Sequence, residues 1–201
     1  MVAMSYNELT ASVRARLLLL ARKVVEQGCK TGSLLDLDSA LEQQSLNHLL
    51  LNSILFEPGC CFVSLYKGGH LRGCIGALEP YQSLLNDIII HAYDAAFNDP
   101  RFPALVEDEL SELTFEISIL SVQEKIECAT EAQLLQQLVP FKDGLILEEG
   151  MKRATYLPSV WQSLKDKKEF LQQLKLKAGL EKDYWSGTIK AYRYQTIGFS
   201  E

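Results

Sequence analysis

Hydrophobic positions in the first hundred residues recur mainly at helical spacing. The stripe Val13, Leu17, Leu20 and Val24 predicts a helix over residues 9–27, with Gly28 as its stop signal. A weaker pattern predicts a second helix over residues 38–51, capped by Asp38 or Ser39. A third apolar stripe predicts a helix over residues 83–98, which the prolines that follow bring to an end.

Between the second and third helices the pattern indicates a hairpin. Residues 60–67 are rich in β-forming side chains, Gly68-Gly69 is typical of a two-residue turn, and residues 70–78 return. With that turn, Lys67 lies opposite His70, Leu65 opposite Arg72 and Val63 opposite Cys74. Because side chains alternate along a strand, one face would carry His70, Arg72, Cys74 and Gly76 together with Lys67, Leu65, Val63 and Cys61. A bulge between Arg72 and Cys74 would separate them.

The second half of the chain continues with short strands and two helices. Strands are predicted at residues 114–122, 145–148, 151–157 and 187–198, and helices at residues 131–138 and 158–177. Helices and strands do not alternate strictly, and hairpins adjoin separate helices. The sequence therefore predicts an α+β fold with mainly antiparallel sheets and flanking helices.

Composition narrows the class of protein. The 201 residues carry a formal net charge of -6 with a sequence pI of about 5.2, which argues mildly against broad nucleic-acid binding. The N-terminus has no signal-peptide pattern, and the apolar run at residues 17–21 is too short to span a bilayer, so we expect a cytoplasmic protein. Five cysteines without a C-x-x-C spacing predict free thiols rather than a zinc site or disulfide framework.

The segment around Cys74 carries the most informative chemistry. Gly73 and Gly76 would weaken a strand unless another backbone or a ligand comes close, and a nearby arginine such as Arg72 favours the reactive thiolate. Cys74 is therefore a candidate nucleophile or ligand-binding thiol, with a small buried hydrophobic side chain as the alternative. The predicted register also puts Cys61 on the same face, which would allow a redox pair. No histidine is evidently placed as a base.

Further charged residues form a second group of candidates. Asp99 and Arg101 stand among restricting prolines, either as a helix stop with an ion pair or as a rigid loop that presents both charges. Glu116 and Ser118 project from one face of an otherwise apolar strand. If that face is covered, the carboxylate needs a partner, and Arg72, Arg101 or Arg153 would supply it. His48 and His91 lie on helical patterns without metal-ligand spacing.

These residues together resemble a known family. The run Leu71-Arg72-Gly73-Cys74-Ile75-Gly76 is similar to the signature of the AMMECR-type domain, also called AmmeMemoRadiSam system protein A. Ordered matches follow at residues 62–65, 95–102, 116–118, 143–147, 153–158 with Trp161, and 177–180, so the resemblance covers residues 56–200. His91 departs from the asparagine often found there. Cys60 and Cys61 depart from the usual small residues, which weakens the redox-pair hypothesis.

The resemblance implies one AMMECR-type domain over residues 1–201, with residues 1–55 as an N-terminal helical part and with a larger and a smaller subdomain around a cleft. It also implies a shared pathway with a radical-SAM protein and a Memo-like protein. Three hypotheses remain: an enzyme or enzyme subunit, a non-catalytic adaptor that uses the same hairpin, and nucleic-acid binding. The first assigns catalysis to Cys74 and Arg72, and binding to Lys67, Gly73, Gly76, Asp99, Arg101, Glu116, Ser118 and Arg153. The sequence identifies neither a cofactor nor a substrate.

Overall fold

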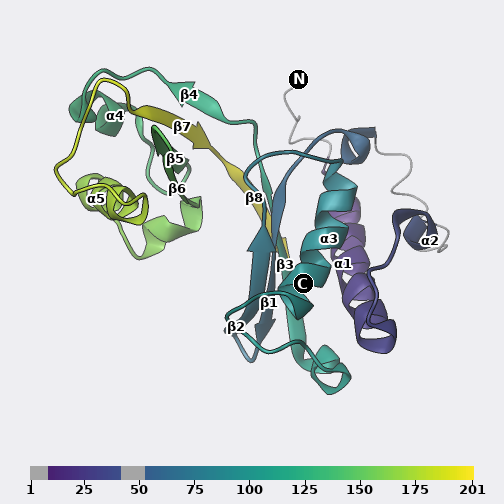
Figure 1. The fold of residues 1–201 in the computed structure, drawn as a ribbon. Helices are drawn as coiled ribbons and strands as arrows, with labels where there is room; N and C mark the ends of the chain where they lie inside the picture. Colours follow the sequence, from purple (N-terminus) through teal and green to yellow (C-terminus); the bar gives the residue numbers. More distant parts are fainter. Residues whose placement is uncertain (1–8, 42–52) are drawn as a thin grey trace. The chain divides into compact units, whose positions relative to one another are not determined.

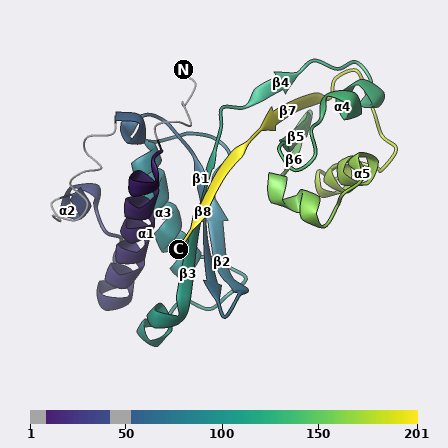
Figure 2. The same ribbon diagram turned by 180° about the vertical axis from the view of Figure 1, so that it is seen from behind.

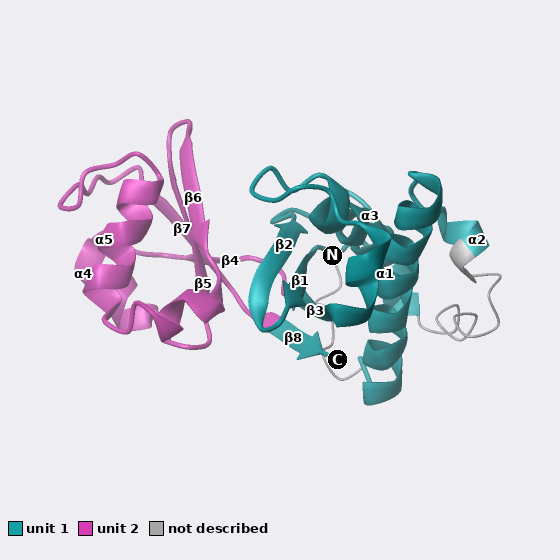
Figure 3. Cartoon of the chain, turned by 90° about the horizontal axis from the view of Figure 1, so that it is seen from below, with its two compact units in different colours: residues 1–120, 197–201 teal, residues 121–196 magenta. Residues whose placement is uncertain are grey.

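The computed structural model describes residues 9–41 and 53–201, and the chain divides into two compact units (Figures 1 and 3). Unit 1 falls within residues 1–120 and 197–201, and unit 2 is residues 121–196. Each unit has its own hydrophobic core and its own four-stranded sheet. Helices and antiparallel sheets are mixed in this way, so the predicted α+β class is confirmed.

Unit 1 contains the N-terminal helices and the predicted hairpin. Its helices are α1 (Ala11–Thr31), α2 (Leu37–Leu41) and α3 (Leu84–Phe97), with the 3-10 helices η3 (Ser53–Phe56) and η4 (Glu107–Glu112). Its strands are β1 (Cys61–Lys67), β2 (His70–Gly76), β3 (Leu113–Leu120) and β8 (Thr196–Ser200). Most of the second predicted helix, including His48, lies outside the described residues.

The sheet of unit 1 has the strand order β2-β1-β3-β8, and Figure 2 shows β8 beside β3. One face is apolar. It carries every second residue of two neighbouring strands: Cys61, Val63 and Leu65 of β1, and Phe115, Ile117 and Ile119 of β3. These side chains are fully buried in one core with α1 and α3 (Figure 1). The opposite face, called the outer face below, carries Phe62, Ser64 and Tyr66 of β1 and Thr114, Glu116 and Ser118 of β3.

The first helix does not stop at Gly28. It continues to Thr31 and ends at Gly32, whose φ of 69° is the left-handed conformation that favours glycine after a helix. Gly28 has a different role, because a Cβ there would lie 2.3 Å from the Phe97 ring of α3. The predicted stop was wrong. A glycine can mark either the end of a helix or a close contact between helices, and Gly28 marks a contact.

The hairpin is confirmed, but its register changes at Arg72. Gly68 and Gly69 both have positive φ, as a type I′ turn requires, and Lys67 lies opposite His70 as predicted. A bulge then makes Tyr66 pair with Leu71 and Leu65 with Gly73, so Ser64, not Val63, lies opposite Cys74. Arg72 is the extra residue of the bulge, and Cys74 therefore faces outward with Ser64.

Unit 2 is built around a second sheet with the order β4-β7-β5-β6. Its elements are β4 (Glu124–Ile126), α4 (Glu131–Gln137), β5 (Gly144–Glu149), β6 (Lys152–Tyr156), η5 (Pro158–Gln162), α5 (Lys167–Lys177) and β7 (Lys190–Tyr194). The centre of its core is a stacked pair, Trp161 and Phe170, with ring centroids 3.7 Å apart and both side chains fully buried.

Two long predicted elements of the second half are each divided. The helix expected over residues 158–177 breaks between η5 and α5, because the Asp166 side chain accepts the Glu169 N–H at 2.9 Å and so caps a new helix. The strand expected over residues 187–198 is interrupted at Gln195, so that β7 belongs to one sheet and β8 to the other. Among the helices of residues 9–41 and 53–201, none has the length and hydrophobicity to cross a membrane.

Candidate functional site

Cys74 lies in a row of polar side chains on the outer face of unit 1. Ser64 of the middle strand β1 pairs with Cys74 of β2 on one side and with Glu116 of β3 on the other. The Ser64 hydroxyl donates to the Cys74 sulfur over 3.2 Å. Cys74 is half-buried, with its side chain on the face away from the helices. The structure thus gives this thiol a polar setting rather than a place in the apolar core.

The Asp99–Arg101 loop holds the backbone of Cys74. Strand β2 is an edge of its sheet, which leaves alternate N–H and C=O groups without a neighbouring strand. The Cys74 N–H donates to Asp99 Oδ2 over 2.8 Å, and Arg101 Nη2 donates to the Cys74 carbonyl over 2.9 Å. The two side chains together take the place of a further strand and fix the position of Cys74.

Asp99 and Arg101 also bind each other. Arg101 donates to the Asp99 carboxylate from Nε over 2.9 Å and from Nη2 over 2.7 Å, and its own backbone N–H adds a third bond of 3.0 Å. These bonds to Arg101, followed by the Cys74 N–H, hold the pKa of Asp99 well below its ordinary value despite burial. The carboxylate is 2% exposed and the Arg101 side chain 54%, so the ion pair has one buried end and one open end.

The arginine beside the thiol is Arg101 and not Arg72. The pKa of Arg101 is raised first by Asp99 and further by the Cys74 side chain. Arg72 instead forms a two-bond ion pair with Glu109, over 3.0 and 2.9 Å. The bulge at Arg72 separates it from Cys74, and the prediction of a shared face is therefore wrong.

Arg72 is part of a separate charged cluster with Lys67. Lys67 Nζ lies 3.3 Å from Glu109 and 3.4 Å from Glu112 of η4. Hydrogen bonding by Arg72, with smaller contributions from Val106 N–H and Lys67, lowers the pKa of Glu109 to about 2. Lys67 and Arg72 thus link the hairpin to η4, while the binding role of Lys67 and the catalytic role of Arg72 stay predictions.

The two glycines of the motif are explained by close packing within the chain. A Cβ on Gly73 would lie 1.9 Å from the carbonyl oxygen of Ala95 in α3. A Cβ on Gly76 would lie 2.4 Å from the Phe62 ring and 2.5 Å from the Cys61 carbonyl oxygen. Both positions therefore require glycine so that β2 can approach its own neighbours.

Tyr66 is a member of the row that sequence reasoning missed. Burial raises its pKa most, and Glu116 and Cys74 raise it further, while Ser64 lowers it. The phenol therefore lies within electrostatic range of all three residues. Polar Ser64 and aromatic Tyr66 alternate with the apolar core-facing residues along β1, and the meaning of this pattern becomes clear only with the correct register.

The remaining predicted residues occupy different places. Ser118 lies two positions from Glu116 on the outer face, opposite Phe62. Arg153 belongs to β6 of unit 2, where its Nε donates to Glu148 over 2.9 Å. Of the arginines considered for Glu116, Arg72 binds Glu109, Arg101 binds Asp99 and Arg153 binds Glu148.

Cys61 is not positioned to pair with Cys74. It is fully buried on the core face of β1, whereas Cys74 lies opposite Ser64 on the outer face. The sheet separates the two sulfur atoms, so the redox-pair hypothesis is wrong. Cys61 instead contacts Asp87 of α3 through its backbone N–H, over 2.8 Å.

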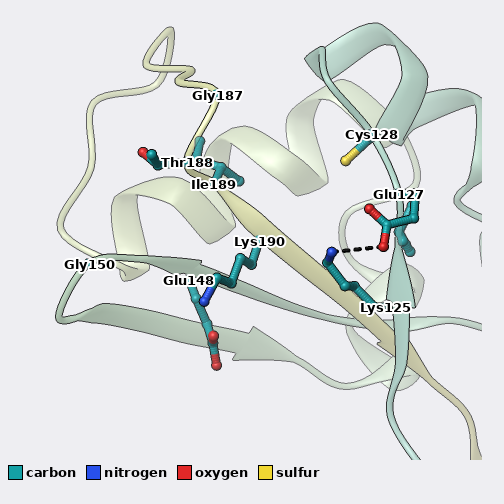
Figure 4. Close-up of a pocket in the computed structure, with 10 residues that line it drawn as sticks. Lys125, Glu127, Cys128, Glu148, Gly150, Gly187, Thr188, Ile189 and Lys190 are labelled. Carbon is teal, nitrogen blue, oxygen red and sulfur yellow. Dashed lines mark hydrogen bonds and ion pairs between the residues drawn. The ribbon is translucent and has the colours of Figure 1, made fainter.

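Unit 2 contains a hollow with a volume of about 480 Å³ at one end of its sheet (Figure 4). Lys125, Glu127, Cys128, Glu148, Thr188 and Lys190 are among its lining residues. Lys125 and Glu127 form an ion pair of 2.7 Å inside it, drawn as a dashed line in Figure 4. None of the predicted site residues lines this hollow.

The outer face brings a thiol, a hydroxyl and a cation together. Cys74 places a sulfur atom there, Ser64 a hydroxyl that donates to that sulfur, and Arg101 a cation with an exposed side chain. Nη1 of Arg101 makes no hydrogen bond to the residues that the structure describes, so it is open to an anionic group. Glu116 and Tyr66 supply further proton-carrying groups in the same row.

Comparisons with known proteins agree on one family. The model of the AMMECR1 family matches residues 18–199. A protein of Thermofilum pendens is 34% identical over 97% of this chain and 92% of its own length. A protein of Methanothermobacter thermautotrophicus is 38% identical over 70% of this chain and 74% of its own length. The crystal structure of an uncharacterized protein from Pyrococcus horikoshii is 32% identical and has a TM-score of 0.78, covering 92% of this chain and 89% of that one.

Proposed function

Because the chain belongs to the AMMECR1 family, we propose that its function resides in the motif that resembles the family signature, as an enzyme or enzyme subunit with Cys74 as nucleophile. The observation that carries the proposal is the 3.2 Å hydrogen bond from the Ser64 hydroxyl to the Cys74 sulfur on the outer face. A hydroxyl donor is most useful to a sulfur that carries negative charge. A cysteine that served only as a small core residue would have no need of such a partner.

The proposed substrate is a small anionic electrophile. Arg101 lies next to the thiol and has an exposed side chain, and its orientation is fixed by Asp99. A guanidinium held in this way can bind a carboxylate or phosphate of a substrate. The Cys74 sulfur then forms a bond to an electrophilic carbon of the same substrate, the bond from that carbon to its leaving group breaks, and the thiol proton passes to solvent. Arg101 thus takes the role that the sequence alone suggested for Arg72.

The adaptor hypothesis loses one supporting feature. It used Gly73 and Gly76 to let the hairpin approach a partner's backbone. The space at both glycines is filled by Ala95, Phe62 and Cys61 of the same chain. Cooperation with a radical-SAM protein and a Memo-like protein is kept as part of the proposal, on the family resemblance. Its test is whether either protein co-purifies with the full chain.

Competing alkylation reagents test the role of the thiol and of Arg101. Iodoacetate is anionic and iodoacetamide is neutral, and mass spectrometry of the Cys74 peptide gives the rate of each reaction. We expect Cys74 to react faster than Cys128, with a preference for iodoacetate that Cys128 does not have. Arg101→Gln should reduce that preference at Cys74. Arg14→Gln changes an arginine of α1, a helix packed on the core face of the sheet, and should leave the preference unchanged.

Two results would count against the proposal. If Cys74 reacted no faster than Cys128 with either reagent, it would not be a nucleophile. If the preference for iodoacetate persisted in Arg101→Gln, the anion would be bound by another group. Folding of each variant is checked by circular dichroism before the rates are compared.

A further inference from the structure

A second thiol of unit 1 lies in a cluster of metal-binding side chains. Cys61 begins β1, and Asp87 and His91 lie one turn apart on α3. The three residues are 0%, 2% and 8% exposed. Sulfur, carboxylate oxygen and ring nitrogen atoms of the cluster all lie within 4.8 Å of one another. This cluster is on the core side of the sheet and shares no residue with the site around Cys74.

Two of the three ligand atoms already lie close together. His91 Nδ1 is 3.1 Å from Asp87 Oδ2. In a tetrahedral zinc site with bonds of about 2.0–2.3 Å, neighbouring ligand atoms are about 3.3–3.7 Å apart. The nitrogen–oxygen distance is near that range, and the sulfur needs only a shift of about 1 Å to reach it.

The Asp87 carboxylate is oriented by a backbone N–H and a side-chain amide. The backbone N–H of Cys61 donates to Oδ2 over 2.8 Å, and Gln82 Nε2 donates to Oδ1 over 3.1 Å. Carboxylates that bind metals are commonly held by such hydrogen bonds, which fix the group without neutralising it. Asp87 is 2% exposed, and its carboxylate lies within 4.8 Å of the ligand atoms of Cys61 and His91.

We propose that Cys61, Asp87 and His91 bind one zinc ion between β1 and α3. A thiolate, a carboxylate and a neutral imidazole are ligands that zinc accepts together, and their two negative charges balance the charge of the ion. Without the ion, burial and the Asp87 carboxylate raise the pKa of the Cys61 thiol well above its ordinary value, so the sulfur is protonated. Binding then forms a zinc–sulfur bond and releases the thiol proton to solvent.

Cobalt(II) provides a direct probe because a cobalt–thiolate bond absorbs in the near ultraviolet. The full chain is treated with a chelator, freed of it, and titrated with cobalt, which zinc then displaces. We expect the absorption to saturate at one cobalt ion per chain and to disappear in Cys61→Ser. His91→Gln, which retains an N–H donor for Asp87, should bind at least about tenfold more weakly.

Matched variants and a measurement on the unaltered chain complete the test. Cys128→Ser and His70→Gln change a cysteine and a histidine elsewhere and should keep the full absorption. Zinc X-ray absorption of the unaltered chain should report one sulfur ligand with nitrogen and oxygen ligands, and this result does not depend on whether a variant folds. Absence of the cobalt band, a band that survives in Cys61→Ser, or a zinc spectrum without sulfur would overturn the proposal.

Discussion

At the scale of single residues, Asp99 is the group that holds Cys74 in place. Its buried carboxylate accepts the Cys74 N–H and three bonds from Arg101. A buried carboxylate with this many donors stabilises the fold and positions the thiol at the same time. The sequence left two interpretations of Asp99 and Arg101: an ion pair that ends the helix, or a rigid loop that exposes both charges. In the structure the Asp99 side chain is buried and the Arg101 side chain is exposed.

Replacing the carboxylate tests the stabilising part of this role. Asp99→Asn removes the charge and returns an N–H₂ donor toward Arg101, so we expect a loss of about 2–3 kcal/mol in the free energy of unfolding. The measurement is urea unfolding followed by circular dichroism. Asp94→Asn is the control, because Asp94 lies on the preceding helix α3 and its carboxylate bonds only to Asn98 in the described hydrogen bonds. It should change stability by less than about 0.5 kcal/mol.

The pH dependence of the same variant has a definite sign. The pKa of Asp99 is lower in the folded protein than in the unfolded chain, where it is about 3.9. Its stabilising contribution is therefore complete well above that value and is lost as pH falls toward the folded-state pKa. The stability difference between the unaltered chain and Asp99→Asn should be constant from about pH 6 to 8 and shrink below about pH 4. A difference that grew on acidification would contradict this assignment.

At the scale of elements, the bulge at Arg72 decides which side chains meet. It directs Arg72 to Glu109 of η4 and lets Cys74 face Ser64. The hairpin and its turn could be predicted because Gly68-Gly69 and the β-forming residues are local signals. The bulge could not, because it arises from the pairing of β2 with β1 and from the charge of an element 35 or more residues away in the sequence. One extra residue was enough to exchange Arg72 for Arg101 as the partner of the thiol.

The same contrast holds for the other elements. Helix α3 was predicted nearly to its ends, since Ser83 caps it and an apolar stripe runs along it. The single helix expected over residues 158–177 was wrong at Asp166. The apolar pattern continues through this position, but the Asp166 side chain caps the start of a new helix there. The role of Asp87 could not be predicted either, because its partner Cys61 becomes a neighbour only when β1 packs on α3.

A double-mutant cycle can measure the link between β2 and η4. Arg72→Met and Glu109→Gln remove the two ends of the ion pair, whose side chains are 12% and 16% exposed. We expect a coupling energy of about 1–3 kcal/mol in the free energy of unfolding. Because the pKa of Glu109 is lowered to about 2, this contribution should be complete at neutral pH and fade between about pH 4 and pH 2. A coupling energy near zero at pH 7 would mean that the pair adds nothing to stability.

Close approach of α3 to β2 is the second element-scale feature that can be tested. Gly73→Ala would place a Cβ 1.9 Å from the Ala95 carbonyl oxygen, which is backbone and cannot move aside cheaply. We expect a loss of about 3 kcal/mol or more in unfolding free energy, at the upper end for overpacking. Gly187→Ala is the matched control, since nothing lies within 4 Å of its Cβ position and its φ is not positive. Equal stability of both variants would show that β2 and α3 do not pack this closely.

At the scale of the whole molecule, the chain enters unit 2 after β3 and returns to unit 1 at β8. The two hydrophobic cores share no residue. The family resemblance implied a larger and a smaller subdomain, but the strand pattern did not show where the chain returns from one to the other. The interruption at Gln195 depends on which sheet each half of the predicted strand joins. Two cores of this kind are expected to open separately, with a local free energy set by the packing of each.

Hydrogen exchange can show whether the cores are independent. Phe170→Ala removes the ring stacked on Trp161 and should destabilise unit 2 by about 3–5 kcal/mol. Mass spectrometry of the exchanged chain should then show faster exchange in the peptides of β5, β6 and α5, with the peptides of β1 and α3 unchanged. Leu65→Ala, in the core of unit 1, is the reciprocal variant and should have the opposite pattern. If either variant accelerated exchange equally in both units, the chain would unfold as one cooperative body, and the site around Cys74 would depend on the core of unit 2 as much as on its own.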